Sequence, residues 1–251
     1  MFDFGAFLGY LDNGFLLRGV VVTLWLTIGS MAGGLLLGTL LALARAGGGK
    51  ALARAAGFYV WVFRGTPLIV QLVIVYTGLP QLGLKFGVVE SALLALTLNE
   101  AAYLSEIIRA GFNGVPPGQT DAARALGLNR ARTIWLVTLP QALRIIIPPL
   151  GNSVNGLLKA TSITSVISME ELMRRGQMVM QLRFEVLEVY CVVAVYYLVL
   201  TTLWDFAQRA LERRFGRGYA PAQVGMTQAG VAQVGVAQAG VAQAGVKAEH
   251  A

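Results

Sequence analysis

The chain has 251 residues, of which 56% are hydrophobic and 13% are charged, whereas about 25% of residues are charged in an ordinary soluble domain. This composition argues against a soluble fold. The net charge of +7 could suggest nucleic acid, but most Lys and Arg lie in short segments between long apolar runs, as in the cytoplasmic loops of membrane proteins. We therefore expect an all-α integral membrane protein and no nucleic-acid partner.

The first two apolar segments in chain order predict transmembrane helices. Residues 1–15 form a short segment that we place outside the membrane. Residues 19–44 carry no charge, and at 1.5 Å per residue they are long enough to cross about 30 Å of hydrocarbon. The next helix is expected over residues 58–84, which places Arg64 inside the membrane.

Three further segments complete a predicted bundle of about five transmembrane helices. A helix over residues 88–110 would be apolar but would carry Glu100, Glu106 and Arg109. One over residues 133–158 contains three prolines, so we expect it to be kinked and packed inside the bundle, where neighbours can satisfy the freed carbonyls. The last is expected over residues 186–206. The transmembrane domain would thus cover residues 16–215.

The distribution of basic residues predicts the orientation. Residues 45–54, 109–132 and 205–217 carry three, four and four Lys or Arg, against three acidic residues. Such segments face the cytoplasm. Five crossings with the N-terminus outside and the C-terminus inside satisfy every segment. Residues 216–251 have no Leu, Ile, Phe or Trp and repeat the unit GVAQ, so we expect a disordered tail.

Enzymatic and metal chemistry find little support in the composition. The single cysteine, Cys191, lies in an apolar run, and the single histidine, His250, is next to the last residue. No disulfide framework, cysteine zinc site or histidine-based catalytic group can be assembled from them. We expect no catalytic residue, no metal and no cofactor. The apolar run starting at Leu16 lacks the basic segment and cleavage site of a signal peptide.

A polar stretch between the third and fourth predicted helices, Val115–Leu143, has the features of a docking element. Pro116, Pro117 and Gly118 turn the chain, and an alanine-rich helix follows. Gly127 is placed to end that helix in a left-handed conformation, and Asn129 to cap the next helix. The expected helix covers about residues 117–127. A membrane protein seldom needs such a helix outside the bilayer unless a partner binds it, although an ordinary connector helix would show the same pattern.

This stretch resembles the cytoplasmic signature of binding-protein-dependent ABC importer permeases. That signature is Glu-Ala-Ala, a glycine, nine residues and Ile-x-Leu-Pro. Here Asp121-Ala122-Ala123 matches the first part, Gly127 the glycine and Val137-Thr138-Leu139-Pro140 the last, with nine residues between. Asp121 replaces Glu and Val137 replaces Ile. The sequences FRGTPLIVQ, AAYLSEIIRAG, LPQALRIIIPPLGN and LLKATSITSVISMEEL extend the resemblance, specifically to the polar amino-acid branch, over residues 15–215.

The resemblance implies a type I ABC importer permease in a bacterial inner membrane. Two permease subunits, identical or homologous, would form the pathway for a polar or charged amino acid. A cytoplasmic ATPase dimer would drive it, since the chain has no Walker A motif, and an extracytoplasmic binding protein would deliver the substrate. Membrane lipid surrounds the subunits. The residues expected to couple it to the ATPase are Asp121, Ala122, Ala123, Gly127, Leu139 and Pro140.

Polar side chains within the predicted helices are candidates for the substrate pathway, because charges inside a membrane are costly and usually functional or paired. Arg64 could meet the substrate carboxylate and a glutamate its ammonium group. Alternatively, an Arg–Glu pair could hold the second and third helices together. Glu100 and Glu106 are six residues apart, so we do not expect them to share a face. The candidates are Arg64, Gln71, Glu100, Tyr103, Glu106, Asn152, Asn155 and Ser162. For Tyr103, Asn152, Asn155 and Ser162, a hydrogen bond between helices is at least an equal alternative.

Two features of the sequence allow more than one interpretation. Glu170, Glu171, Arg174 and Arg175 could either contact a binding protein outside the membrane or form a solvated helix face. A second function, a membrane scaffold or assembly subunit without a pathway, would suit the small residues of the first helix, which favour close helix packing. These small residues are Gly29, Gly33, Gly34 and Gly38.

Overall fold

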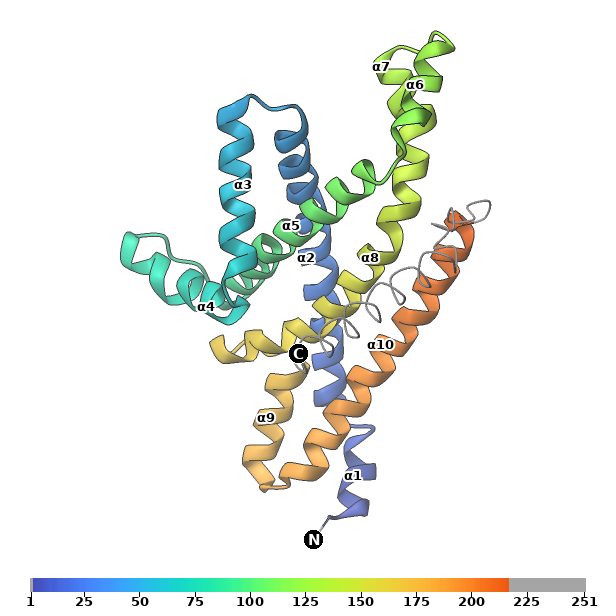
Figure 1. The fold of residues 1–251 in the computed structure, drawn as a ribbon. Coiled ribbons are helices and arrows are strands. Elements are labelled where there is room, and N and C mark those ends of the chain that lie inside the picture. Colours follow the sequence, from blue (N-terminus) through green and yellow to red (C-terminus); the bar gives the residue numbers. More distant parts are fainter. Residues whose placement is uncertain (1, 217–251) are drawn as a thin grey trace, which may run out of the picture. The chain divides into compact units, whose positions relative to one another are not determined.

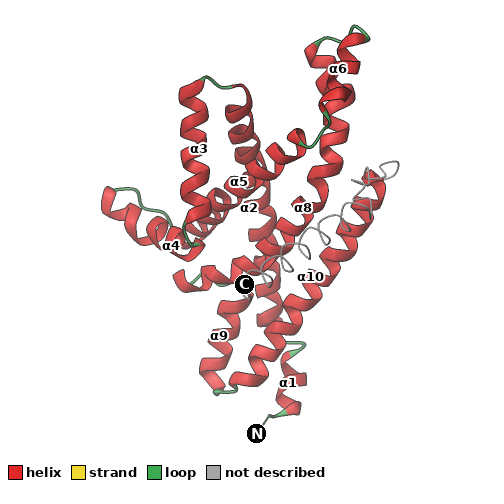
Figure 2. Cartoon of the chain, viewed as in Figure 1, coloured by secondary structure: helices red, strands yellow, loops and turns green. Residues whose placement is uncertain are grey.

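The computed structural model describes residues 2–216, and all regular structure in this range is helical (Figure 1). Figure 2 shows that only short loops join the helices. The long helices are α2 (Gly14–Gly47), α3 (Lys50–Gly65), α5 (Val88–Asn113), α8 (Leu139–Ala160) and α10 (Val186–Gly216). The shorter ones are α1 (Phe4–Tyr10), α4 (Leu68–Val73), α6 (Pro117–Ala125), α7 (Arg130–Thr133) and α9 (Leu172–Arg183). The predicted tail lies outside the described residues.

Three helical stretches in the described range are long and apolar enough to cross a membrane: Gly14–Gly47, Arg130–Ile167 and Val186–Phe215. A fourth crossing results if the bent pair Lys50–Gly65 and Leu68–Leu82 is counted as one. The predicted third span does form a helix, α5, but it is not among these because charged residues lower its hydropathy. An all-helical membrane fold is confirmed, whereas the number of five crossings stays a prediction.

The second predicted helix, over residues 58–84, is wrong as a single element. The chain leaves the helix after Gly65, and the next helical stretch makes an angle of 107° with α3. Pro67 is the physical reason, because a proline disfavours helical backbone in the residue before it and has no N–H for the helix. Thr66 is accordingly extended, with φ −117° and ψ 145°. Arg64 therefore lies at the end of α3 and not in the middle of a helix.

Two wide helical turns precede prolines. Ile74–Gly78 and Ile134–Thr138 are π-helical, and in both the N–H after the turn donates to the carbonyl five residues earlier. Pro80 and Pro140 follow each turn at the same distance. Because proline cannot donate to the carbonyl four residues before it and its ring clashes with that carbonyl, the preceding turn widens. Pro148 and Pro149 lie inside α8 without ending it.

The glycines of α2 allow close packing against α5. A Cβ added at Gly33 would lie 2.8 Å from Thr97, and one at Gly34 would lie 3.1 Å from the Cβ of Glu100. At Gly38 it would lie 2.9 Å from the carbonyl oxygen of Ala101. Small residues that let two backbones approach are typical of helix pairs in membranes. The close packing of α2 on α5 within this chain therefore accounts for these glycines.

We expect Gly38→Ala to destabilise the folded protein by about 1 kcal/mol, because the new methyl group would press on the backbone of α5 and this overpacking outweighs the gain in helix propensity. Gly57→Ala is the matched control, since Gly57 also lies inside a helix but a Cβ added there would meet nothing within 4 Å. Thermal unfolding of both variants in detergent measures the difference. Equal melting temperatures would contradict the packing.

Candidate functional site

The predicted docking element forms a helix at one end of the bundle. Figure 1 shows α6 and α7 beyond the N-terminal end of α8, at the end opposite to α1 and α9. The helix α6 covers Pro117–Ala125 with a proline in its first turn, where a missing N–H costs no helical hydrogen bond. Val115, just before it, is buried in a cluster with Ala142 and Ile146 of α8. The base of α6 is thus fixed to α8.

The end of α6 has the geometry that the sequence predicted. Gly127 has φ +79°, its N–H donates to the carbonyl of Arg124, and the N–H of Leu128 donates to the carbonyl of Ala123. This pair of bonds is a Schellman motif, which favours glycine at the left-handed position. The side chain of Asn129 accepts a hydrogen bond from the N–H of Arg132 at 2.9 Å. Both capping predictions are confirmed.

The alanines of α6 face different ways. Ala123 is only 3% exposed and packs inside the chain, whereas Ala122 is exposed. Ala123, one of the residues expected to couple the permease to the ATPase, therefore points into the chain and is not accessible on the surface of α6. Leu126 is 83% exposed, and Asp121 forms an exposed ion pair with Arg124 at 3.8 Å. The accessible surface of α6 thus contains Asp121, Ala122 and Leu126.

The last part of the signature lies where the widened turn meets α8. Leu139 and Pro140 are the first residues of α8 and directly follow the turn Ile134–Thr138. The side chain of Gln141 donates to the side-chain oxygen of Gln119 at 3.4 Å, which connects α8 to α6. Leu139 and Pro140 therefore lie at the start of α8, next to the contact between Gln141 and Gln119, and not on the exposed surface of α6.

Arg64 lies over an aromatic ring and not beside a glutamate. Its guanidinium carbon is 5.5 Å from the ring centre of Tyr103 on α5, a distance at which a cation interacts with the π face. Within residues 2–216 Arg64 makes no ion pair. The predicted Arg–Glu pair between the second and third helices is thus not formed by Arg64.

Gln71 forms hydrogen bonds across the break between α3 and α4. Its amide nitrogen donates to the carbonyls of Phe63 at 2.8 Å and Thr66 at 3.1 Å, and its oxygen accepts from Asn99 of α5 at 3.0 Å. The last carbonyls of a helix have no partner within the helix, and Gln71 supplies one. Asn99, which the sequence interpretation did not single out, joins α3, α4 and α5 at this point.

Glu100 and Glu106 of α5 both contact α2. Glu100 is 7% exposed, packs against Gly34, and has one carboxylate oxygen without a hydrogen-bond partner in the described part of the chain. Glu106 is bound by Arg45 of α2 and by Arg109 one turn further along α5, the latter at 2.7 Å. An ion pair does hold two helices together, but these are α2 and α5, and the cation is Arg45. Both residues thus contact α2, at Gly34 and at Arg45, and the expectation that they do not share one face of α5 stays a prediction.

The polar residues of α8 make hydrogen bonds, most of them to α10. The side-chain nitrogen of Asn155 donates to Asp205 at 2.8 Å, and the oxygen of Asn152 accepts from Gln208 at 3.4 Å. Trp204 donates to the carbonyl of Gly151 at 2.8 Å. Ser162, in the 3-10 turn Thr161–Ile167 that follows α8, donates to the carbonyl of Lys159 at the end of α8. The partners on α10 could not be identified from sequence, because only the packing of the two helices brings them together.

Glu171 is neither a docking residue nor part of a solvated face. It is 0% exposed and caps α9, accepting from the N–H groups of Met173 at 3.0 Å and Arg174 at 2.8 Å. It also accepts from the hydroxyl of Tyr197 at 2.8 Å and lies next to Thr23. Both interpretations from the sequence are wrong for this residue. It connects α2, α9 and α10.

We expect the contribution of Glu171 to the free energy of unfolding to decrease as the pH rises. Burial raises the pKa of the Glu171 carboxyl above the ordinary value of 4.5, and the hydrogen bonds it accepts oppose this only in part. The folded protein thus holds a proton that the unfolded chain has lost, so the free energy of unfolding decreases as pH rises from 4.5 through the raised pKa. Unfolding measured over a pH series should show a shallower decrease for Glu171→Gln. An identical slope in both proteins would contradict the buried site.

Comparison with known proteins identifies the family. Residues 34–217 match the family model described as binding-protein-dependent transport system inner membrane component. The chain is 39% identical to the glutamine transport system permease protein GlnP of Escherichia coli K12 over 201 residues, which is 79% of this chain and 92% of GlnP. It is 40% identical to the arginine transport system permease protein ArtQ of Bacillus subtilis, over 80% of this chain and 92% of ArtQ.

A solved structure has the same fold. The crystal structure of an amino acid ABC transporter with histidines superposes with a TM-score of 0.80 at 36% sequence identity, covering 85% of this chain and 99% of that one. Fold, signature spacing and sequence similarity agree. This chain belongs to the family of binding-protein-dependent transport system inner membrane components, the membrane-spanning permeases of ABC importers.

Proposed function

We propose that this chain is the permease subunit of an ABC importer for polar or charged amino acids. The observation that carries the proposal is α6, a short helix at one end of the bundle whose surface around Asp121, Ala122 and Leu126 is left open by the rest of the described chain. An exposed leucine beside small residues fits a groove on another protein. The similarity to amino-acid permeases supports the substrate class.

The partners follow from the same arrangement. A separate cytoplasmic ATPase dimer hydrolyses ATP and receives α6 of each permease, a second permease subunit completes the pathway, and an extracytoplasmic binding protein delivers the amino acid. The N-terminus is outside and the C-terminus in the cytoplasm, as the distribution of basic residues indicates. The positions of α6 and of α1 at opposite ends of the bundle agree with this orientation (Figure 1).

Two sets of contacts would transmit a movement of α6 to the rest of the bundle. Val115 and Gln119 attach α6 to α8, and the Arg45–Glu106–Arg109 cluster attaches α5 to α2 close to the start of α6. A movement of α6 would therefore move α2, α5 and α8 together. Coordinated movement of packed helices against a partner subunit is how such interfaces open and close a path.

Among the candidate pathway residues, Arg64 and Tyr103 are best suited to meet the substrate. Both are exposed, and no carboxylate of the described residues neutralises Arg64, so a substrate carboxylate could bind it. Glu100, with its unpartnered oxygen, is the candidate for the ammonium group. Gln71, Glu106, Asn152, Asn155 and Ser162 already have partners within the chain and would contribute as fixed walls of the path.

Uptake of radiolabelled amino acids into vesicles tests the function. The permease is reconstituted with its ATPase and binding protein, and ATP is supplied on the ATPase side. We expect ATP-dependent accumulation of a polar amino acid such as glutamine or arginine, reduced at least about tenfold in Arg64→Gln. Stimulated ATP hydrolysis without accumulation of any amino acid would instead support a scaffold subunit. The glycines that would have favoured a scaffold are already used between α2 and α5.

A further inference from the structure

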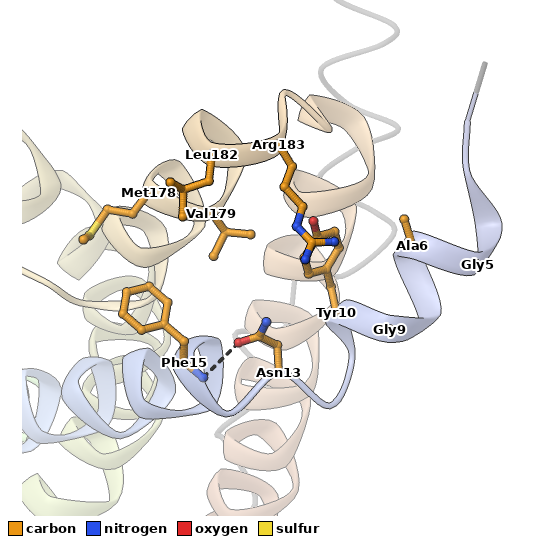
Figure 3. Close-up of a pocket in the computed structure, with 10 residues that line it drawn as sticks. All are labelled: Gly5, Ala6, Gly9, Tyr10, Asn13, Phe15, Met178, Val179, Leu182 and Arg183. Carbon is orange, nitrogen blue, oxygen red and sulfur yellow. Dashed lines mark hydrogen bonds between the residues drawn. The ribbon is translucent and has the colours of Figure 1, made fainter.

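A cavity of about 690 Å³ lies at the end of the bundle opposite to α6, between α1, the start of α2 and α9 (Figure 3). Gly5 and Gly9 form its wall on α1, and Val179 and Leu182 form its wall on α9. The ring of Phe15 points into it from the start of α2. The cavity is lined mostly by apolar atoms and is partly open. The proposed transport path does not use it.

Charged groups of both signs lie at one edge of this cavity. The guanidinium of Arg183 lies beside the ring of Tyr10 in Figure 3, and within the described residues it makes no ion pair. The hydroxyl of Tyr10 donates to the carboxylate of Glu185. The edge therefore presents a cation and a carboxylate separated by a phenol.

Exposed apolar side chains lie on α1 and at the end of α9, two of the helices that line the cavity. Leu182 is 81% exposed and Phe184 82% exposed, and on α1 Phe4 and Leu8 are also exposed. Such a concentration of apolar surface is unfavourable in water and typical of a region in contact with lipid. Contact with lipid at this end of the protein would cover this apolar surface and the open side of the cavity.

The backbone of Phe184 gives a second, independent indication of contact with lipid. Its φ is +58°, a left-handed conformation that is strained for a residue with a side chain. Glycine would avoid this strain at the end of α9. Since the ring is almost fully exposed, packing within the chain does not compensate for it. Contact of the ring with lipid would do so, because aromatic rings favour the membrane interface.

We propose that the cavity binds one zwitterionic phospholipid with a primary ammonium headgroup, such as phosphatidylethanolamine. The guanidinium of Arg183 binds the phosphate with its planar donors, and the carboxylate of Glu185 faces the ammonium group. One acyl chain lies along Gly5, Gly9 and Val179. The carboxylate beside the headgroup disfavours an anionic lipid. This binding is independent of the proposed transport function.

Native mass spectrometry of the complete transporter, purified from vesicles of defined composition, tests the proposal. After exchange into detergent, we expect the wild type to retain one phosphatidylethanolamine per permease. Arg183→Gln should retain at least about tenfold less, as expected for loss of a charge-assisted hydrogen bond. Lys85→Gln, which removes an exposed positive charge from another loop, should retain the lipid.

A second pair of variants separates lipid binding from loss of structure. Gly9→Leu fills the cavity, and a Cβ added at Gly9 would meet nothing within 4 Å, so the variant should fold but lose the lipid. Gly57→Leu is its control, with equal space around it, and should retain the lipid. Unchanged lipid in Gly9→Leu would overturn the proposal. So would equal retention of phosphatidylglycerol, or displacement by inorganic phosphate, since either would indicate a simple anion site.

Discussion

Gly127→Asp is expected to abolish ATP-driven uptake while leaving the permease folded in the membrane. The backbone of Gly127 is left-handed, so any side chain adds strain of about 1 kcal/mol at the end of α6. Among residues 2–216 no atom lies within 4 Å of a Cβ placed there. The added carboxylate would therefore point into the space that the ATPase is proposed to occupy. Uptake into vesicles should fall to background, while membrane insertion and thermal unfolding change little.

Two comparisons isolate the cause. Gly49→Asp places the same side chain at another open position, where φ is −55°, and should transport normally. Gly127→Asn keeps a residue that tolerates the left-handed conformation without adding a charge, and should retain part of the activity. Normal uptake by Gly127→Asp would contradict docking of α6, since the added carboxylate would lie on the proposed docking surface.

Glu106→Gln should lower the free energy of unfolding by about 2 to 4 kcal/mol. Glu106 is largely buried between Arg45 and Arg109, with 18% of its side chain exposed. Without the carboxylate, two guanidinium groups remain close together and partly removed from water, which is costly. Thermal unfolding and the yield of folded protein measure the effect. Glu90→Gln, at the exposed first turn of the same helix, should cost less than about 1 kcal/mol.

The partner variant Arg45→Gln distinguishes a structural pair from a substrate contact. If Glu106 and Arg45 hold α2 against α5, both variants lower stability, and their effects are not additive in the double variant. A different outcome would contradict this interpretation: fully stable Glu106→Gln protein that has lost uptake but still couples to the ATPase. That result would place Glu106 in the substrate path.

Local chemistry made much of the fold predictable. Apolar runs located α2, α5 and α10 to within several residues at most ends, although α10 continues ten residues beyond its expected end at Phe206. The left-handed Gly127 and the cap at Asn129 followed from residue type and spacing alone, since short-range sterics decide them. The break at Pro67 carried a local signal as well, because a residue before proline avoids helical backbone.

Contacts between distant segments could not be predicted. Arg45 and Glu106 are 61 residues apart, and only the close packing of α2 on α5 brings them together. Glu171 lies in a charged segment that suggests a solvated helix, yet Thr23 and Tyr197 bury it from two other helices. Likewise, Asn155 pairs with Asp205 across α8 and α10. Sequence patterns report the local environment of a residue, whereas these partners depend on tertiary structure.

Nucleotide-dependent cross-linking can show whether α6 docks on the ATPase. Cys191, the single cysteine of the chain, is replaced by alanine, and Leu126→Cys is paired with a cysteine in the groove of the ATPase. We predict that Leu126→Cys cross-links to the ATPase and that Leu182→Cys, equally exposed at the opposite end, does not. Labelling of Leu126→Cys by a membrane-impermeant thiol reagent from the outside, without any cross-link, would contradict the docking of α6 on a cytoplasmic ATPase.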